Sequence, residues 1–594
     1  MKSKFSSLAL FSTIIAFAPI GYAKTPAQAD KVLRIAFEAP DDGFDMVKTF
    51  NFYSGNVADV IFERLLQYDY LANPVKLAPS TAQSMPVIKE NGKVYIFKIK
   101  PGIYFTADPA FKGQRRELIA EDYVYSIKRI LDPKNHSSSF AFIDQKIVGA
   151  NALVEQAKQT GHFDYDAKIE GLKALDRYTL QFTLTQPDYN FPYILAYSTF
   201  GATAREVVEY YKDRLGMHPV GTGPYMLSKY VPRSKIELIA NPDYRGFVWD
   251  FKSTGTAWDN QLVKEMTGKK MPQIGKVNIS IIEEEQSRWL AFQSKQLDFD
   301  KLTASSIPKV LDHNNQLKPA MQTKGIRLYP NKEAEITYTM LNMRDPIIGG
   351  TSLEKVALRR AIAMSFNVDE YIRILRKGQA VKAEMLVPAG VNGHNPNYRS
   401  SIGYNPVLAN KLLDHFGYKK SADGYRTLPN GKALTLKINT ESGSASVMYS
   451  ELWKKNLDAI GIRVDFRVSN FADNLKAATQ CQYMVWSGAW HADYPEGENF
   501  TQLLYGPNVG RGNQFCYRST AYDDLYKQAM QQPPEKRMPF YEKMSRQIEA
   551  DNPLILQDTR IRNWVIQSHV QGFKAHPIMN SNWQYLDIAS PRQK

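Results

Sequence analysis

Long apolar runs are missing from the chain beyond its N-terminal segment. No later segment approaches the roughly 20 consecutive apolar residues that cross a bilayer, so a polytopic membrane protein is excluded. Hydrophobic residues make up 43 % of the 594 positions and charged residues 23 %, which is the balance of a soluble globular protein. The composition therefore also excludes a disordered or collagen-like chain, and the length favours several domains over a single compact core.

Clustered charge is missing as well, although the chain is basic overall. There are 75 lysines and arginines against 60 aspartates and glutamates, a formal net charge of +15. The longest basic tracts are pairs such as Arg115-Arg116 and Lys269-Lys270, which are much shorter than the basic runs of nucleic-acid-binding tails. We therefore expect no nucleic-acid partner, whereas the charge does not exclude an acidic or anionic ligand.

The common catalytic motifs are absent too. The sequence has no G-x-S-x-G elbow, no G-x-x-x-x-G-K-[ST] loop and no H-E-x-x-H, and its nine histidines are dispersed. The segment Gly-Thr-Gly at 221–223 is followed by Pro-Tyr-Met, so it does not complete a G-x-G-x-x-G dinucleotide fingerprint. The acidic residues 283–285 are better explained as a strand end or a helix cap than as a metal or glycosidase site. We therefore expect no enzyme, no cofactor and no metal site.

The N-terminus has the pattern of a secretory signal peptide. Lys2 and Lys4 precede the apolar stretch 8–18, and the small residues around Tyr22 in 21–23 form a cleavage site. We predict a signal peptide over residues 1–23 with cleavage after Ala23, or alternatively near residue 29. No cysteine lies nearby to accept a lipid, so we expect an exported protein without an anchor.

Cysteine is scarce, with Cys481 and Cys516 as the only pair. In an oxidising compartment a lone pair most simply forms one disulfide, and closing a loop of this size stabilises a fold by roughly 3 to 4 kcal/mol in the chain-entropy model. Two buried free thiols are the alternative.

Short strands alternate with amphipathic helices along the whole chain, which predicts an α/β fold. The clearest strands are 94–99, 180–184, 433–438 and 462–468; the clearest helices are 119–131, 448–460 and 353–375, the last one broken at 367–369. The run from 433 to 468 is a β-α-β unit, the building block of a mainly parallel sheet. Residues 243–272 have weak periodicity, and we predict a long surface excursion there.

Several segments resemble the family 5 solute-binding proteins, the peptide, nickel and haem receptors of ABC importers. The matching patterns occur in the order that is usual in that family, over nearly all of the chain after the signal peptide. They are a strand, turn and helix at 97–105 and 120–129, a glycine-rich turn and "NPDY" at 221–225 and 241–244, a helix at 358–365, and a ligand-site segment at 490–506. The insertion between Phe105 and Glu117 is longer than usual and affects only an outer loop.

This resemblance implies an α/β, two-lobed class II periplasmic-binding-protein fold of the cluster C type, with an extra outer domain on lobe I. We expect the chain to cross between the lobes near residues 328–338 and 556–564. After the signal peptide, 1–23, the implied segments are 24–70 and 211–330 for the core of lobe I, 71–210 for its outer domain, 331–558 for lobe II, and 559–594 for the C-terminal return to lobe I.

The function implied by the resemblance is that of a periplasmic, monomeric receptor. It would capture an oligopeptide or related small solute between its lobes and deliver it to an inner-membrane ABC permease. A non-peptide ligand on the same fold, such as haem, a nickel chelate, a glycan or a peptide antibiotic, stays open, and a secreted hydrolase is the alternative from another class.

Asp493 is the principal candidate site residue. In peptide-binding members of the family the aspartate at this place accepts the ligand's α-ammonium, through a strong charge-assisted bond. A carboxylate beside Trp490 and Tyr494 is costly to bury without a cation, which supports the same role. The alternatives are an ion pair with a neighbouring arginine or a helix cap for Asp493, and simple core packing for Trp490.

The partner of the ligand's carboxylate is harder to identify. Some oligopeptide binders carry an arginine three residues before the tryptophan, where this chain has Ser487. Arg511, in a glycine-flanked loop, is a substitute candidate, and a solvent-exposed arginine is the alternative. We interpret His491 as a polar wall residue and not as a metal ligand.

Overall fold

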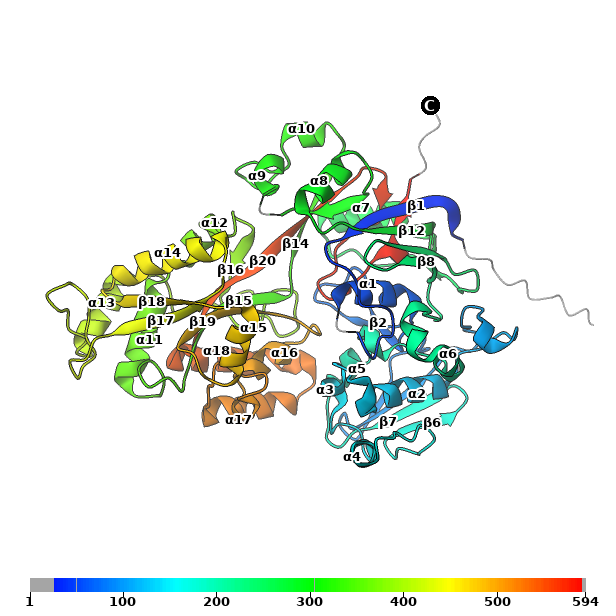
Figure 1. The fold of residues 1–594 in the computed structure, drawn as a ribbon, viewed down its shortest axis with the longest axis horizontal. Coiled ribbons are helices and arrows are strands. Elements are labelled where there is room, and N and C mark those ends of the chain that lie inside the picture. The colour runs from blue at the N-terminus through cyan, green and yellow to red at the C-terminus, as the bar shows by residue number, and fades with distance from the viewer. Residues whose placement is uncertain (1–25, 50, 304, 590–594) are drawn as a thin grey trace, which may run out of the picture.

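The computed structural model describes residues 26–49, 51–303 and 305–589, and these fold into two lobes joined by crossing strands (Figure 1). The signal peptide predicted over residues 1–23, with its cleavage after Ala23, lies outside the described residues. Within the three described ranges, no helix has the length and apolar character needed to cross a membrane. The two-lobed α/β architecture predicted from the sequence is confirmed.

Lobe I is built on a four-stranded sheet whose strands come from distant parts of the chain. In spatial order the strands are β1 (Gln28–Phe37), β12 (Ile274–Ile281), β9 (Lys235–Ala240) and β8 (Tyr225–Val231). β1 and β12 are parallel, and the other pairs are antiparallel. Alternate residues of β1, Leu33, Ile35 and Phe37, enter a core that also contains the C-terminal residues Val570 and Trp583. The chain therefore returns to lobe I at its end.

The glycine-rich turn before β8 packs directly on the end of helix α1 (Phe52–Ile61). A Cβ added to Gly221 would lie 2.0 Å from the carbonyl oxygen of Ile61, and one added to Gly223 would lie 2.4 Å from that of Val60. The N–H of Gly223 donates to the Ile61 oxygen at 2.9 Å. Only glycine permits this close backbone approach, which fixes α1 beside the lobe I sheet.

The outer domain has its own sheet and core below the lobe I sheet (Figure 1). Its strands run in the order β4 (Val87–Lys89), β5 (Val94–Lys98), β7 (Thr179–Thr183) and β6 (Leu172–Asp176), all antiparallel. Helix α2 (Ala120–Leu131) packs on this sheet. The carboxylate of Asp122 stabilises the N-terminus of the helix by accepting the N–H of Ile119 at 2.8 Å. The short helix α5 (Phe191–Ile194) lies at the contact with lobe II, where Tyr193 stacks on Tyr494.

Lobe II contains the larger part of an eight-stranded sheet with helices packed against it. Its strands are β15 (Glu335–Leu341), β16 (Ala380–Lys382), β17 (Thr435–Thr440), β18 (Arg463–Val468), β19 (Val485–His491) and the first half of β20 (Leu554–Ile566). The main helices are α11 (Leu353–Ser365), α14 (Ser444–Asp458), α17 (Thr520–Met530) and α18 (Met538–Asp551).

The prediction of a mainly parallel sheet is wrong for this lobe. The β-α-β unit is present, because β17 and β18 are parallel and α14 connects them, and β17 is also parallel to β19. The pairs β15–β19, β15–β20 and β16–β20 are antiparallel, so the sheet is mixed. The antiparallel part contains the strands that return to lobe I, whose direction no local pattern specifies.

Two strands carry the chain between the lobes at the predicted places. β14 (Arg327–Lys332) pairs antiparallel with the second half of β20, from Arg327 opposite Ile566 to Lys332 opposite Ile561. The first half of β20 pairs with β15 in lobe II, where Thr337 faces Asp558. β20 therefore belongs to both lobes, and it forms the hinge together with the β14–β15 crossing (Figure 1).

The prediction of a surface excursion over residues 243–272 is also wrong. Trp249 is fully buried in a small core with Leu262 and Met266 of helix α7 (Ala257–Met266), and this core packs on Tyr585 of the C-terminal return. Leu262 and Met266 lie one helical turn apart. The periodicity is weak because the rest of this core comes from irregular segments and the short strands β10 (Phe247–Val248) and β11 (Lys270–Met271).

Two local predictions about caps and breaks are confirmed. Glu284 is the N-cap of helix α8 (Glu285–Gln293), where its carboxylate accepts the N–H of Ser287 at 2.7 Å. The helical run after residue 353 ends at Ser365 and begins again as α12 (Val368–Ile374), with Asn367 as the new N-cap. The acidic run at 283–285 is therefore part of a helix start.

Cys481 and Cys516 are bonded as a disulfide with their Cα atoms 6.0 Å apart. Cys481 lies shortly before β19 begins at Val485, and Cys516 lies in the segment that leads to α17. The bond therefore ties this segment to the starting end of β19.

A candidate ligand-binding site between the lobes

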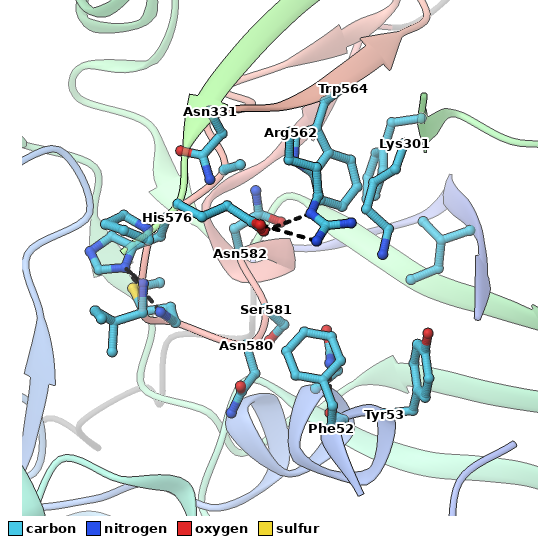
Figure 2. A pocket seen from close by; sticks show the side chains of 18 of the residues that line it. Phe52, Tyr53, Lys301, Asn331, Arg562, Trp564, His576, Asn580, Ser581 and Asn582 are labelled. Atoms are coloured by element: carbon cyan, nitrogen blue, oxygen red, sulfur yellow. Dashed lines mark hydrogen bonds and ion pairs between the residues drawn. The ribbon is translucent and has the colours of Figure 1, made fainter. Parts of the chain in front are cut away.

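A cavity of about 560 Å³ lies between the lobes beside the hinge (Figure 2). Lobe I contributes the end of β1, the start of α1, the strand β13 (Phe299–Lys301) and the loop 573–583. Lobe II contributes residues 491–493 at the end of β19, and the hinge contributes Asn331, Glu333, Arg562 and Trp564. Because both lobes and the hinge line the cavity, a ligand bound there contacts both lobes and can stabilise one arrangement of the lobes relative to each other.

Aromatic side chains form much of the lobe I wall. Phe52 begins α1 and is 58 % exposed, while Tyr53 follows it with its N–H held by Asn51 Oδ1 at 2.7 Å. Figure 2 shows these two rings on the opposite side of the cavity from Arg562 and Trp564. An exposed phenylalanine facing a cavity offers apolar surface that a ligand can cover.

The loop 573–583 is held in place by a partly buried histidine. Nδ1 of His576 accepts the N–H groups of Ile578 and Met579 at 3.1 and 3.0 Å, as the dashed lines of Figure 2 show. Burial lowers the pKa of His576 to about 3, so the imidazole is neutral at neutral pH and can act as this acceptor. The loop therefore presents Asn580 and Ser581 to the cavity from a fixed backbone.

Asp493 lines the cavity from lobe II and is oriented by Asn499. The amide Nδ2 of Asn499 donates to Oδ2 of Asp493 at 3.1 Å, and Oδ1 of Asn499 accepts the backbone N–H of Asp493 at 3.1 Å. The same Oδ1 accepts the indole N–H of Trp490 at 2.9 Å. Burial raises the pKa of Asp493, and among the described residues no arginine or lysine forms an ion pair with it.

The structure places Trp490 and His491 on different sides of this segment. Trp490 packs against the lobe II core and is not one of the residues that line the cavity, so it reaches Asp493 only through Asn499. His491 is exposed and lines the cavity, with Nδ1 3.2 Å from the carbonyl oxygen of Ala492. Among the described residues no group of three histidine, cysteine or acidic side chains could hold a metal ion.

Tyr494 lies in a separate contact between the lobes and not in the cavity. It is buried, its hydroxyl donates to Glu498, and its ring stacks on Tyr193 of the outer domain with 6.4 Å between centroids. Asn190 of the outer domain donates to Oε2 of Glu498 at 3.0 Å and accepts from Arg537 at 2.7 Å. Tyr494 therefore helps to join the lobes on the side away from the hinge.

Arg511 and Ser487 are also not among the residues that line the cavity. Arg511 is exposed in the turn that follows Gly506–Asn508, and the disulfide ties this region to the starting end of β19, whereas Asp493 follows the other end of that strand. Ser487 points into a polar cluster of lobe II, where its hydroxyl bonds the hydroxyls of Thr339 and Tyr449. The sequence does not specify to which end of β19 the disulfide ties this loop.

Two cations that line the cavity are already paired with carboxylates. Arg562 donates to both oxygens of Glu333, at 2.6 and 3.1 Å, and Lys301 lies 2.5 Å from Oε1 of Glu38. Burial acts to raise the pKa of each glutamate, but the paired cation holds it below its ordinary value. Both pairs are therefore ionised at neutral pH, and within each pair the positive charge compensates the negative charge.

Asp300 on β13 is an acidic residue at the border of the cavity, and it was not predicted from the sequence. It is only 9 % exposed, and it accepts the N–H of Lys301 at 2.9 Å. It pairs with Val565 of β20, so its side chain lies on the other face of the strand from Phe299 and Lys301. Burial raises its pKa to about 6. Among the described residues it forms no ion pair.

A two-lobed α/β fold with a lined cavity beside paired hinge strands defines a solute receptor. The chain belongs to the bacterial extracellular solute-binding proteins of family 5, because the family model described as "Bacterial extracellular solute-binding proteins, family 5 Middle" matches residues 76–512. The family resemblance drawn from the sequence motifs is confirmed.

Individual proteins of this family are similar over almost their full length. "Di/tripeptide-binding protein 2" of Pseudomonas aeruginosa (strain UCBPP-PA14) is 24 % identical over 96 % of this chain and 97 % of its own. The Helicobacter pylori periplasmic binding protein DppA, solved with the peptide STSA, has 22 % identity and a TM-score of 0.67 over 94 % of this chain and 98 % of its own. The murein tripeptide binding protein MppA, solved in an unliganded open form, has 18 % identity and a TM-score of 0.70 over 95 % and 99 % of the two chains.

Proposed function

We propose that this protein is the periplasmic ligand-binding component of an ABC importer and that it captures short peptides between its lobes. It acts as a monomer after removal of residues 1–23, carries no lipid anchor, catalyses no reaction and delivers its ligand to an inner-membrane permease. The names of its relatives, which include a di/tripeptide-binding protein and a receptor solved with a tetrapeptide, support the choice of ligand.

The observation that carries this proposal is the state of Asp493. A carboxylate that has lost much of its water is costly unless a cation and hydrogen bonds compensate. Here Asn499 donates one hydrogen bond to the half-buried Asp493, while the cations of the cavity, Lys301 and Arg562, are paired elsewhere. A peptide's α-ammonium carries the charge and the N–H donors that this carboxylate lacks.

The rest of the cavity suits the remainder of a short peptide. Phe52 and Trp564 offer apolar surface to side chains, and Asn331 and Asn580 offer amide groups to peptide N–H and C=O groups. Because Asp493 belongs to lobe II and Phe52 to lobe I, one peptide contacts both lobes. Such contacts favour the arrangement in which the lobes lie close together.

Titration calorimetry with Ala-Ala-Ala and its N-acetylated form tests this function. We expect the free-amine peptide to bind and Asp493→Asn to weaken it by about 10-fold to 100-fold, since a hydrogen bond to a charged group contributes about 1.5 to 3 kcal/mol. Asp524→Asn is the matched control, because Asp524 is an exposed aspartate of lobe II that does not line the cavity. Equal binding of the free and acetylated peptides by the wild-type protein would refute the ammonium anchor.

A further inference from the structure

We propose that the contact of Asn190 in the outer domain with Glu498 and Arg537 of lobe II is a latch, which holds the lobes together and slows the release of a bound solute. The latch lies on the side away from the hinge, where α5 meets the short helix α16 (Glu498–Thr501) (Figure 1). The inference goes beyond the proposed function, because it concerns how the lobes are held and not which solute they hold.

The side chain of Asn190 forms its hydrogen bonds with lobe II. The residue stands directly before α5, where an asparagine often caps the helix, but within the described part of the chain it makes no cap bond. Its amide nitrogen donates instead to Oε2 of Glu498 at 3.0 Å, and its amide oxygen accepts from Nη1 of Arg537 at 2.7 Å. The backbone N–H of Asn190 donates to Asp188 at 2.9 Å, which fixes its position. One side chain therefore binds both an anion and a cation of the other lobe.

The lobe II half of the latch is a buried charge cluster with bonds of its own. Arg537 is only 1 % exposed and lies 3.1 Å from Oε2 of Glu496. Glu498 accepts the hydroxyl of Tyr494 and, at 2.6 Å, the hydroxyl of Tyr526. Because each charge keeps partners within lobe II, the cluster retains its shape when Asn190 withdraws and water takes the place of the amide.

Tyr193 of α5 makes a second contact with the same part of lobe II. Its ring stacks on Tyr494, and its hydroxyl accepts from Nδ2 of Asn392 at 2.9 Å. The backbone N–H of Asn392 donates to the carbonyl oxygen of Pro495 at 3.0 Å, and its own carbonyl oxygen accepts the N–H of Gly497 at 2.9 Å. The outer domain therefore binds one short segment of lobe II at two points.

The latch adjoins the ammonium site of the cavity. Asp493 directly precedes Tyr494 in lobe II, Tyr197 follows Tyr193 by four residues in the outer domain, and both Asp493 and Tyr197 line the cavity. Burial and the nearby carboxylate of Asp493 raise the pKa of Tyr197 to about 12, so these two groups lie close to each other on the two lobes. The latch therefore closes the cavity on the side opposite the hinge.

A bound solute and the latch act on the same equilibrium between lobe arrangements. The solute contacts both lobes and so does Asn190, so each favours the arrangement in which the lobes meet. The affinity for the solute then falls in proportion to the fraction of molecules in that arrangement. Polar groups suit such a contact because water can replace each hydrogen bond when the lobes separate, as in other contacts between domains of one chain.

Stopped-flow release of Ala-Ala-Ala tests the latch, with tryptophan fluorescence as the signal because Trp564 lines the cavity. We expect Asn190→Ala to raise the dissociation rate about 10-fold, since two hydrogen bonds to charged groups are lost and water replaces them in part. The association rate should change by less than about twofold. Tyr193→Phe keeps the stacked ring and removes the acceptor for Asn392, so it should raise the dissociation rate about 2-fold to 5-fold.

Small-angle X-ray scattering without peptide measures the latch independently of any solute. We expect a larger radius of gyration for Asn190→Ala than for the wild type, because the lobes separate more often. Asn151→Ala is the matched control: Asn151 lies on helix α4 (Ala150–Thr160) of the same domain and accepts the N–H of Gln145 at 3.2 Å. It should behave as the wild type in both measurements.

The outcomes separate the latch from the proposed function. Unchanged release from both Asn190→Ala and Tyr193→Phe would overturn the latch and leave the function in place. If Ala-Ala-Ala does not bind the wild type, the proposed function fails, and the scattering alone decides: equal radii for the wild type and Asn190→Ala would overturn the latch. If thermal unfolding shows that Asn190→Ala does not fold, Tyr193→Phe decides by the same two measurements.

Discussion

The acidic residues of the cavity differ in what compensates their charge. On the lobe II face, Asn499 binds both the backbone and the side chain of Asp493, and Trp490 orients Asn499 in turn. On the lobe I face and at the hinge, Glu38 and Glu333 are paired with Lys301 and Arg562. The glutamates therefore have their cations within the protein, whereas Asp493 has a fixed direction and no cation among the described residues, as recognition of a peptide's first nitrogen requires.

The largest expected effect on binding comes from removing the unpaired carboxylate. Asp493→Asn should weaken Ala-Ala-Ala by about 1.5 to 3 kcal/mol, because it removes a hydrogen bond to a charged group. Calorimetry on the wild type, Asp493→Asn and the control Asp524→Asn measures this. Unchanged binding by Asp493→Asn would mean that the carboxylate does not receive the ammonium.

Asp300→Asn should make the ligand-free protein more stable. The folded-state pKa of about 6 lies above the ordinary value of about 3.9, so the contribution of Asp300 to stability is most favourable below about pH 4 and is lost as the pH rises through 6. Removing this titration should raise the free energy of unfolding at pH 7 by about 2 to 3 kcal/mol. Urea unfolding at pH 7 and pH 4 measures the gain, which should be small at pH 4. A loss of stability at pH 7 would indicate a structural role for the carboxylate.

Trp490→Phe should affect only the lobe II face, and by the smallest amount. It removes the indole N–H that donates to Asn499 Oδ1 and keeps an aromatic ring in the lobe II core. The loss of one such hydrogen bond should weaken Ala-Ala-Ala by about 0.5 to 1.5 kcal/mol, which calorimetry on the variant measures. A loss as large as that caused by Asp493→Asn would contradict an indirect role for Trp490.

Much of the fold could be predicted because local patterns specify it. The break at Asn367, the cap at Glu284 and the β-α-β unit each depend on residues within one or two turns of one another. The crossings between the lobes were found from extended segments that together define the hinge. The mixed order of the lobe II sheet was missed, since β20 reaches its neighbours β15 and β16 only through long-range pairing.

The candidate site was found on one face only, for a physical reason. Asp493 lies in a segment with a recognisable motif. The lobe I wall is instead assembled from the end of β1, the start of α1, β13 and the loop 573–583, which come together only in the fold. No pattern within any one of these segments contains that information.

A crystal structure of the wild-type protein with Ala-Ala-Ala is the most direct test of the ammonium anchor. We expect the α-ammonium within hydrogen-bonding distance of Asp493, with one peptide bridging the two lobes. A peptide bound with its carboxylate at Asp493, or bound outside the cavity, would contradict it.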